Sequence, residues 1–359
     1  MKAHFHTLVA VTCASLMATT AIARADSMDD LVKAAKAEGE LTVIALPHDW
    51  CGYGAVIDGF KAKYGLKVNE LNPDAGSGDE VEAIKANKDN KGPQAPDVID
   101  VGLSFGPSAK KDATWDSIPD SAKDAEGYWY GDYYGVMAFE VNKDLVKDSP
   151  KDWADLLKPD YANMVALAGD PRTANQAISA VFAAGLSSAN GDVSKAGQAG
   201  LDFFKDLNAK GNFVPVIGKS APLAQGTTPI ILRWDYNALA DRDSLKGNPP
   251  VDVIVPATGV VAGVYVQAIS AYAPHPNAAK LWMEYLYSDE GQVGWLKGYC
   301  HPIRFNDLAK NNKVPKEVLD KLPPAEGYAK AVFPTLDQQD AYKKAITEQW
   351  DKVVGAAVK

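Results

Sequence analysis

The chain has 359 residues, of which 47% are hydrophobic, and it carries a formal net charge of −9 at pH 7. This length exceeds the roughly 100–200 residues of an ordinary domain, so two lobes are the simplest expectation. The acidic balance argues against nucleic acid or an anionic membrane surface as a partner, because both are bound through basic patches.

The N-terminus has the pattern of a cleavable export signal. Lys2 precedes a stretch, 7–20, that is mostly apolar or small, and Ala23-Arg24-Ala25 fits the small-x-small cleavage rule. Residues 1–25 are therefore predicted to be a signal peptide that is cleaved after Ala25. The stretch is too short for a membrane span, which needs about 20 strongly apolar residues. Cleavage would remove two positive charges and make the mature chain more acidic.

Two cysteines, Cys51 and Cys300, remain in the mature chain. An oxidising compartment favours a disulfide between an even pair of cysteines. The two lie far apart in sequence, so a disulfide would join segments that the fold brings together. The alternative is two separate buried thiols, and the sequence leaves both possibilities open.

The first part of the mature chain is typical of a βαβ unit. We expect a strand at 41–46, a helix over about 56–64 that ends at Gly65, and further strands at 66–71 and 97–101. This order predicts an α/β fold with a mostly parallel sheet. Ligands of such sheets bind at the carboxyl ends of the strands, so the loops 47–54 and 102–107 are the first places to look. The candidate ligand-binding residues there are Asp49, Trp50, Ser104 and Phe105.

The aromatic segment 128–142 is expected to form strands at the floor of a cleft, where the chain crosses into a second lobe. A second α/β series is predicted after it, with helices at 150–159, 201–209 and 236–244 and strands at 164–168, 213–217, 229–233 and 251–255. Segment 259–273 is apolar and β-branched and would return the chain to the first lobe. Two crossing strands make a hinge that suits domain closure.

A candidate anion site follows the predicted strand 164–168. Arg172, Thr173 and Asn175 lie where a helix should begin, and free amides at a helix N-terminus attract an anionic group. The alternative is that Thr173 or its neighbour Asp170 only caps the helix.

A candidate cation site follows the predicted strand 229–233. Asp235 lies between Trp234 and Tyr236, and a carboxylate flanked by aromatic rings suits an ammonium group. The alternative is that Trp234 and Trp50 are core aromatic residues.

The segment 273–292, APHPNAAKLWMEYLYSDEGQ, has the pattern of two short helices, with Asn277 and Ser288 as predicted N-caps. As a string it resembles a signature of bacterial periplasmic solute-binding proteins of ATP-driven importers. The branch that it resembles includes ferric-ion, polyamine, thiamine and aminophosphonate binders. The resemblance extends over essentially the whole mature chain.

The resemblance implies an α/β, two-lobed periplasmic binding protein-like fold with a hinge and a central ligand cleft. It implies a first lobe of residues 26–137 plus about 262–305, a second lobe of 138–261, and a C-terminal helical region, 306–359, packed on the lobes. It also implies a periplasmic monomer that needs no cofactor and has a membrane permease as its partner.

Motifs for catalysis are absent from the sequence: we find no GxSxG, HExxH, Walker, GxGxxG or CxxC pattern. The ferric-binding branch needs two adjacent tyrosines where this chain has Trp234 to Tyr236, so we expect no metal site. The sequence predicts a binding protein, not an enzyme, for a small amine-bearing or zwitterionic solute such as a polyamine or an aminophosphonate. The alternatives are a secreted two-lobed enzyme and a ligand sensor for a signalling partner.

Overall fold

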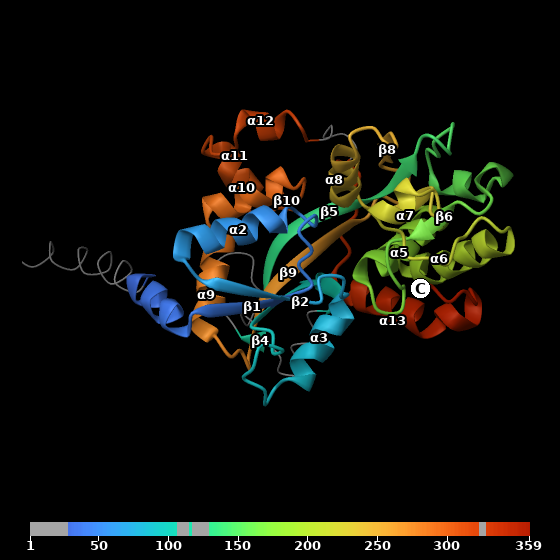
Figure 1. The fold of residues 1–359 in the computed structure, drawn as a ribbon. Coiled ribbons are helices and arrows are strands. Elements are labelled where there is room, and N and C mark those ends of the chain that lie inside the picture. Colours follow the sequence, from blue (N-terminus) through green and yellow to red (C-terminus); the bar gives the residue numbers. More distant parts are fainter. Residues whose placement is uncertain (1–27, 106–114, 117–128, 323–327) are drawn as a thin grey trace, which may run out of the picture.

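The computed structural model describes residues 28–105, 115–116, 129–322 and 328–359 (Figure 1). The predicted signal peptide and the end of the loop 102–107 lie outside the described residues. The molecule is two-lobed and α/β. In Figure 1 the elements around β1 and α2 form one lobe, called here the first lobe, and the elements around α5 and α6 form the other, called the second lobe. The predicted residue boundaries of the lobes stay a prediction.

The first lobe begins as the sequence predicts. A helix over 28–38 precedes the following elements: β1 Glu40–Ile44, α2 Tyr53–Tyr64, β2 Lys67–Leu71, α3 Ser77–Ala86, β3 Val98–Gly102 and the short 3-10 helix η1 Leu103–Phe105. Gly65 ends α2 in the left-handed region, with φ of 72°, which glycine adopts at low cost. Strands β1 and β2 pair in parallel, as a βαβ unit requires.

The larger sheet corrects the prediction of mostly parallel strands. Its order is β3-β9-β5-β7-β6, and β10, β4 and β8 pair at its sides. Only β6 and β7 are parallel among the described pairs of this sheet. The reason is that β5 (Tyr130–Asn142) and β9 (Ala262–Ser270) carry the chain in opposite directions between the lobes, and their neighbours pair antiparallel to them.

Strand β5 is one continuous strand of 13 residues that serves both lobes (Figure 1). Its first half pairs with β9 and with β10 (His301–Pro302), and its second half pairs with β7 and β8. Strand β5 therefore runs from the first lobe into the second.

The second lobe contains η2 Trp153–Leu157, η3 Pro159–Tyr161, β6 Val165–Leu167, α5 Asn175–Ser188, α6 Val193–Ala209, α7 Ser220–Ala224, β7 Ile230–Trp234, α8 Asp235–Leu245 and β8 Val251–Ile254. Two expectations are wrong here. Segment 150–159 forms 3-10 turns, since Pro159 interrupts it. Segment 213–217 forms only an isolated bridge at Phe213, because Pro215 lacks the amide that a longer ladder needs.

The C-terminal part contains α9 Pro276–Leu286, α10 Asp289–Lys297, α11 Phe305–Lys310, α12 Lys316–Leu319 and α13 Leu336–Val353. Ser288 caps α10 through the amide of Gly291, as predicted. Asn277 does not cap α9; the carboxylate of Glu38 instead accepts hydrogen bonds from the amides of Asn277 and Ala278. No described helix is both long and apolar enough to cross a bilayer.

Candidate functional site

A central cavity of about 270 Å³ lies between the lobes. The first lobe contributes the loop after β1, the segment 73–80 and Asp100 of β3. The second lobe contributes the segments 168–170, 173–176 and 217–220 together with Arg233 and Asn237, and Tyr265 of β9 completes the wall. Because both lobes form the wall, a molecule held here would contact both.

The charged residues of the wall are divided between the lobes. The first lobe supplies five acids and no base: Asp49, Asp74, Asp79, Glu80 and Asp100. The second lobe supplies Lys219, Arg233 and Asp170. The carboxylate of Asp170 pairs with Arg172, with 2.7 Å between Oδ2 and Nη2. The cavity therefore has an acidic first-lobe side and a mainly basic second-lobe side.

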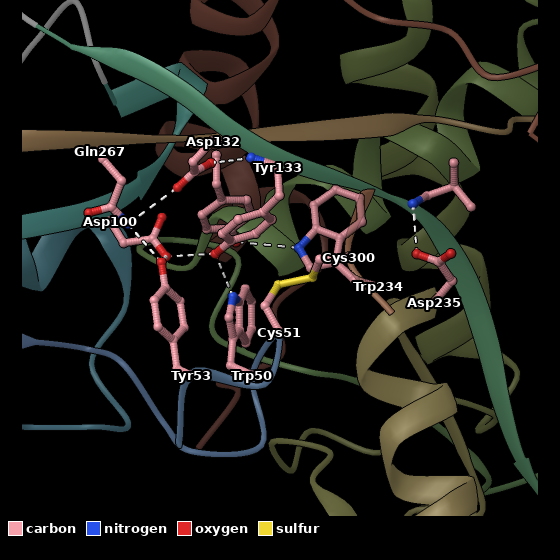
Figure 2. Close-up of a disulfide and its surroundings, with 12 residues drawn as sticks. Trp50, Cys51, Tyr53, Asp100, Asp132, Tyr133, Trp234, Asp235, Gln267 and Cys300 are labelled. Atoms are coloured by element: carbon pink, nitrogen blue, oxygen red, sulfur yellow. Dashed lines mark hydrogen bonds between the residues drawn. A yellow bond between two sulfur atoms is a disulfide. The ribbon is translucent and has the colours of Figure 1, made fainter. Parts of the chain in front are cut away.

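Asp100 lies in a buried network on the acidic side (Figure 2). Its Oδ2 accepts hydrogen bonds from the hydroxyls of Tyr53, at 2.8 Å, and Tyr133, at 2.6 Å. The amide of Gln267 donates to the Tyr53 hydroxyl at 2.7 Å. Burial raises the pKa of Asp100 to about 6, although the tyrosine hydrogen bonds oppose the shift. Burial also raises the pKa of Glu80 well above its usual value.

Trp50 connects this network to the loop after β1. Its indole Nε1 donates to the Tyr133 hydroxyl at 2.7 Å, and its ring meets Tyr236 and Tyr265 edge-on at 5.4 Å. Cys51, the next residue, forms a disulfide with Cys300, with 5.4 Å between the Cα atoms (Figure 2). Of the two possibilities that the sequence leaves open, the structure has the disulfide.

Arg233 and Asn237 present polar groups on the basic side. Nη1 of Arg233 contacts Glu140 at 3.0 Å and Asp241 at 2.6 Å, and burial raises the pKa of Glu140 to about 8. Nε of Arg233 and Oδ1 of Asn237 are buried and have no hydrogen-bond partner among the described residues. Such buried atoms are costly without a partner, and a bound solute could supply an acceptor for Nε of Arg233 and a donor for Oδ1 of Asn237.

Helix α5 begins at this wall. Thr173, Ala174, Asn175 and Gln176 line the cavity, and α5 has no side-chain cap. The amides of the first turn of a helix lack partners within the helix and carry a partial positive charge. The helix start predicted from the sequence is therefore at the cavity, with Thr173 and Asn175 in its wall.

Arg172 does not line the cavity, although the sequence suggests an anion site there. Its guanidinium pairs with Asp170 and also lies 3.4 Å from Asp351 of α13. Ser104 and Phe105 do not line it either: the Ser104 hydroxyl donates to Oδ1 of Asn175 at 3.1 Å, and Nζ of Lys343 lies 4.2 Å from the centroid of the Phe105 ring.

Trp234, Asp235 and Tyr236 are fully buried beside the cavity and do not line it. Asp235 is 1% exposed, and its carboxylate accepts a hydrogen bond from the amide of Val136 (Figure 2). It also accepts a hydrogen bond from the hydroxyl of Tyr328. Trp234 is 0% exposed, in agreement with the alternative that it is a core aromatic residue, whereas Trp50 lines the cavity. The cation-site interpretation of Asp235 has no support in this geometry.

The lobes touch across the cavity. Nζ of Lys219 lies 2.6 Å from Oδ1 of Asp74, and the Ser104–Asn175 hydrogen bond also joins the two lobes. Lys343 of α13, a helix that packs on α5 and α6, donates to the carbonyl of Ser104 at 2.6 Å. Contacts at several points therefore join the two lobes in the described structure.

Comparison with known proteins agrees with this geometry. No curated protein matches the chain. Among solved structures, the chain is similar to the periplasmic binding protein P5PA, at 20% identity over 88% of this chain and 99% of that one, with a TM-score of 0.67. It is also similar to AgtB from A. tumefaciens R10 in complex with agropinic acid, at 15% identity, with the same coverage and a TM-score of 0.68.

A third similar structure is iron-bound HitA from Pseudomonas aeruginosa, at 18% identity over 87% of this chain and 98% of that one, with a TM-score of 0.65. At such identities the likeness shows the two-lobed fold alone. A family model described as bacterial extracellular solute-binding protein matches residues 105–330, which is more than half of the sequence. The chain belongs to the bacterial extracellular solute-binding protein family, whose members bind small solutes for ABC importers.

Proposed function

We propose that the protein is the periplasmic solute-binding component of an ABC importer and captures a small amine-bearing or zwitterionic organic solute. The mature chain begins at Asp26 after removal of the signal peptide, acts as a monomer and delivers the solute unchanged to the permease. It performs no chemistry on the solute and needs no cofactor.

The observation that carries the amine assignment is the acidic first-lobe wall. Five carboxyl groups line one side of a cavity of about 270 Å³. Burial disfavours the charged forms of two of them, Asp100 and Glu80, and raises their pKa values. A bound ammonium group would offset this cost, because an opposite charge within about 4–6 Å favours the ionised carboxylate. Trp50 and Tyr265 supply aromatic surface for the same group.

The cavity also limits the size of the solute. At about 30 Å³ for each water molecule, 270 Å³ corresponds to about nine waters. This volume suits a compact solute of about nine non-hydrogen atoms.

A thermal-shift screen followed by calorimetry tests the proposal. Putrescine, 4-aminobutyrate and 2-aminoethylphosphonate are the amine probes, and 1,4-butanediol and glutarate are the controls without an amine. At 100 times its dissociation constant, a ligand stabilises by about 2.7 kcal/mol. We expect a saturable shift with at least one amine probe and none with the controls, and the bound amine should be recovered unchanged by NMR. Binding of glutarate alone, or turnover of the solute, would contradict the proposed function.

The variant Asp49→Asn removes one charge from the acidic wall without changing size. Because Asp49 is exposed, the variant should weaken amine binding by about 0.2–1 kcal/mol, the range for an ion pair at an exposed site. Asp206→Asn, an exposed position on α6 outside the cavity, is the matched control. Equal affinities of the two variants would remove Asp49 from the site.

A further inference from the structure

We infer that the solute is a zwitterion held in one orientation, with its ammonium group against the first lobe and its anionic group against the second. This inference rests on the proposed function and narrows it, because a polyamine is cationic at both ends. The class of ligand is a compact amino acid-like or aminophosphonate-like molecule with separated charges.

The first argument is the division of charge across the cavity. Every charged residue that the first lobe contributes to the wall is acidic, whereas the second lobe contributes Lys219 and Arg233. The single second-lobe acid in the wall, Asp170, is occupied by Arg172. Arg233 is itself paired with Glu140 and Asp241, so Lys219 is the second-lobe cation that the second ammonium group of a diamine would meet. Repulsion by Lys219 disfavours a diamine.

Lys219 is available to an anionic group although it contacts Asp74. The Lys219 side chain is 51% exposed and that of Asp74 is 76% exposed. A pair as exposed as this contributes little, because water and salt screen it. A ligand that carries both charges can replace the pair with one contact to each partner.

The second argument is the set of hydrogen-bond donors in the second-lobe wall. Arg233 lines the cavity, and its Nε is a buried donor without a partner among the described residues. The uncapped first turn of α5 lies in the same wall. An oxyanion with several acceptor oxygens satisfies helix amides and a guanidinium together, which is why such sites bind carboxylates and phosphates.

The orientation also explains how binding would favour closure. The ammonium group contacts one lobe and the anionic group contacts the other, so a zwitterion satisfies both walls only when the lobes are together. A ligand shifts a conformational equilibrium by its difference in affinity for the two states, and this ligand gains its second contact in the closed state alone.

The test compares three ligands of similar length by calorimetry at pH 7.5 and low salt, using the mature protein. The ligands are 4-aminobutyrate, putrescine and glutarate, and 2-aminoethylphosphonate with 1,3-diaminopropane forms a shorter matched pair. We expect the zwitterion of at least one pair to bind at least tenfold more tightly than the matching diamine. A diamine that binds as tightly as its zwitterion would overturn the inference and leave the proposed function standing. Binding by no amine probe would overturn both.

The variant Lys219→Gln tests the orientation. It should weaken the zwitterion three- to tenfold and leave the diamine unchanged or bound more tightly, because it removes a positive charge from the anionic end. Asp49→Asn should weaken both ligands. Lys205→Gln, an exposed position on α6 outside the cavity, is the control and should change neither. A Lys219→Gln variant that loses affinity for zwitterion and diamine equally would overturn the orientation.

Discussion

Removing the Cys51–Cys300 disulfide should destabilise the protein and disturb the cavity together. The bridge joins residues 249 positions apart, and both cysteines are fully buried. In the chain-entropy model, closing a loop of this length restricts the unfolded chain by an amount equivalent to about 5 kcal/mol. For about 330 residues, with an unfolding entropy near 2.1 cal/mol/K per residue, the melting temperature would fall by about 7 °C.

The disulfide also fixes the position of residues that line the cavity. Cys51 directly follows Asp49 and Trp50 in the chain, and Trp50 donates to Tyr133, which in turn donates to Asp100. Reduction frees the loop after β1 and loosens this chain of hydrogen bonds. We therefore expect the double variant Cys51→Ala/Cys300→Ala to bind the amine probe more weakly, by about threefold to tenfold.

Calorimetry and a count of free thiols test this prediction. Periplasmically produced protein, denatured without reduction and treated with an alkylating agent, should take up no label. The double variant should melt lower than the parent and bind more weakly, whereas Asp206→Asn changes neither property. Two alkylated cysteines in the parent protein, or a double variant that melts at the parent's temperature, would refute the reasoning.

Three further predictions follow from buried contacts. Relative to the parent, the Asp235→Asn variant should gain about 2 kcal/mol in stability between pH 4.5 and pH 8, measured by urea unfolding. The reason is that burial raises the pKa of Asp235 to about 6, so the parent loses this group's contribution as the pH rises through 6; an equal difference at both pH values would contradict this. Gly298→Ala should cost about 1–3 kcal/mol, since a Cβ there would overlap the backbone of Cys51, and an unchanged melting temperature would exclude that close approach. Lys343→Met should open the lobes and increase the radius of gyration of the ligand-free protein in small-angle scattering, because Lys343 joins α13 to Ser104; an identical radius would show that this contact does not control closure.

Much of the fold follows from local patterns in the sequence. The buried strand β1, the glycine that ends α2 and the Ser288 cap of α10 are each specified by neighbouring residues. The strand directions in the larger sheet could not be predicted in the same way. They depend on β5 and β9 running in opposite directions between the lobes, and no local signal states which distant strands will pair.

The candidate site was predicted by region more accurately than by residue. Asp49, Trp50, Thr173 and Asn175 line the cavity. The sequence predicts Trp234, Asp235 and Tyr236 as ligand-binding residues. The residues that line the wall are instead Arg233 and Asn237, two positions before and two positions after Asp235.

The backbone explains this displacement. Side chains alternate along β7 and turn by about 100° per residue along α8, so a choice between neighbouring positions needs the register of both elements. Arg233 could have been predicted as a site residue, since a charged residue at the end of an otherwise apolar strand is unusual. The segment 73–80 gave no such signal, because its polar composition is also typical of a surface connection.

Native mass spectrometry of protein purified from its own periplasm, without refolding, tests the central claim most directly. We predict a single bound species of low mass that is released on denaturation and carries both a primary amine and an acidic group, as derivatisation of each group would show. A released solute without an amine, or a protein that carries no solute and responds to no amine probe, would contradict the account.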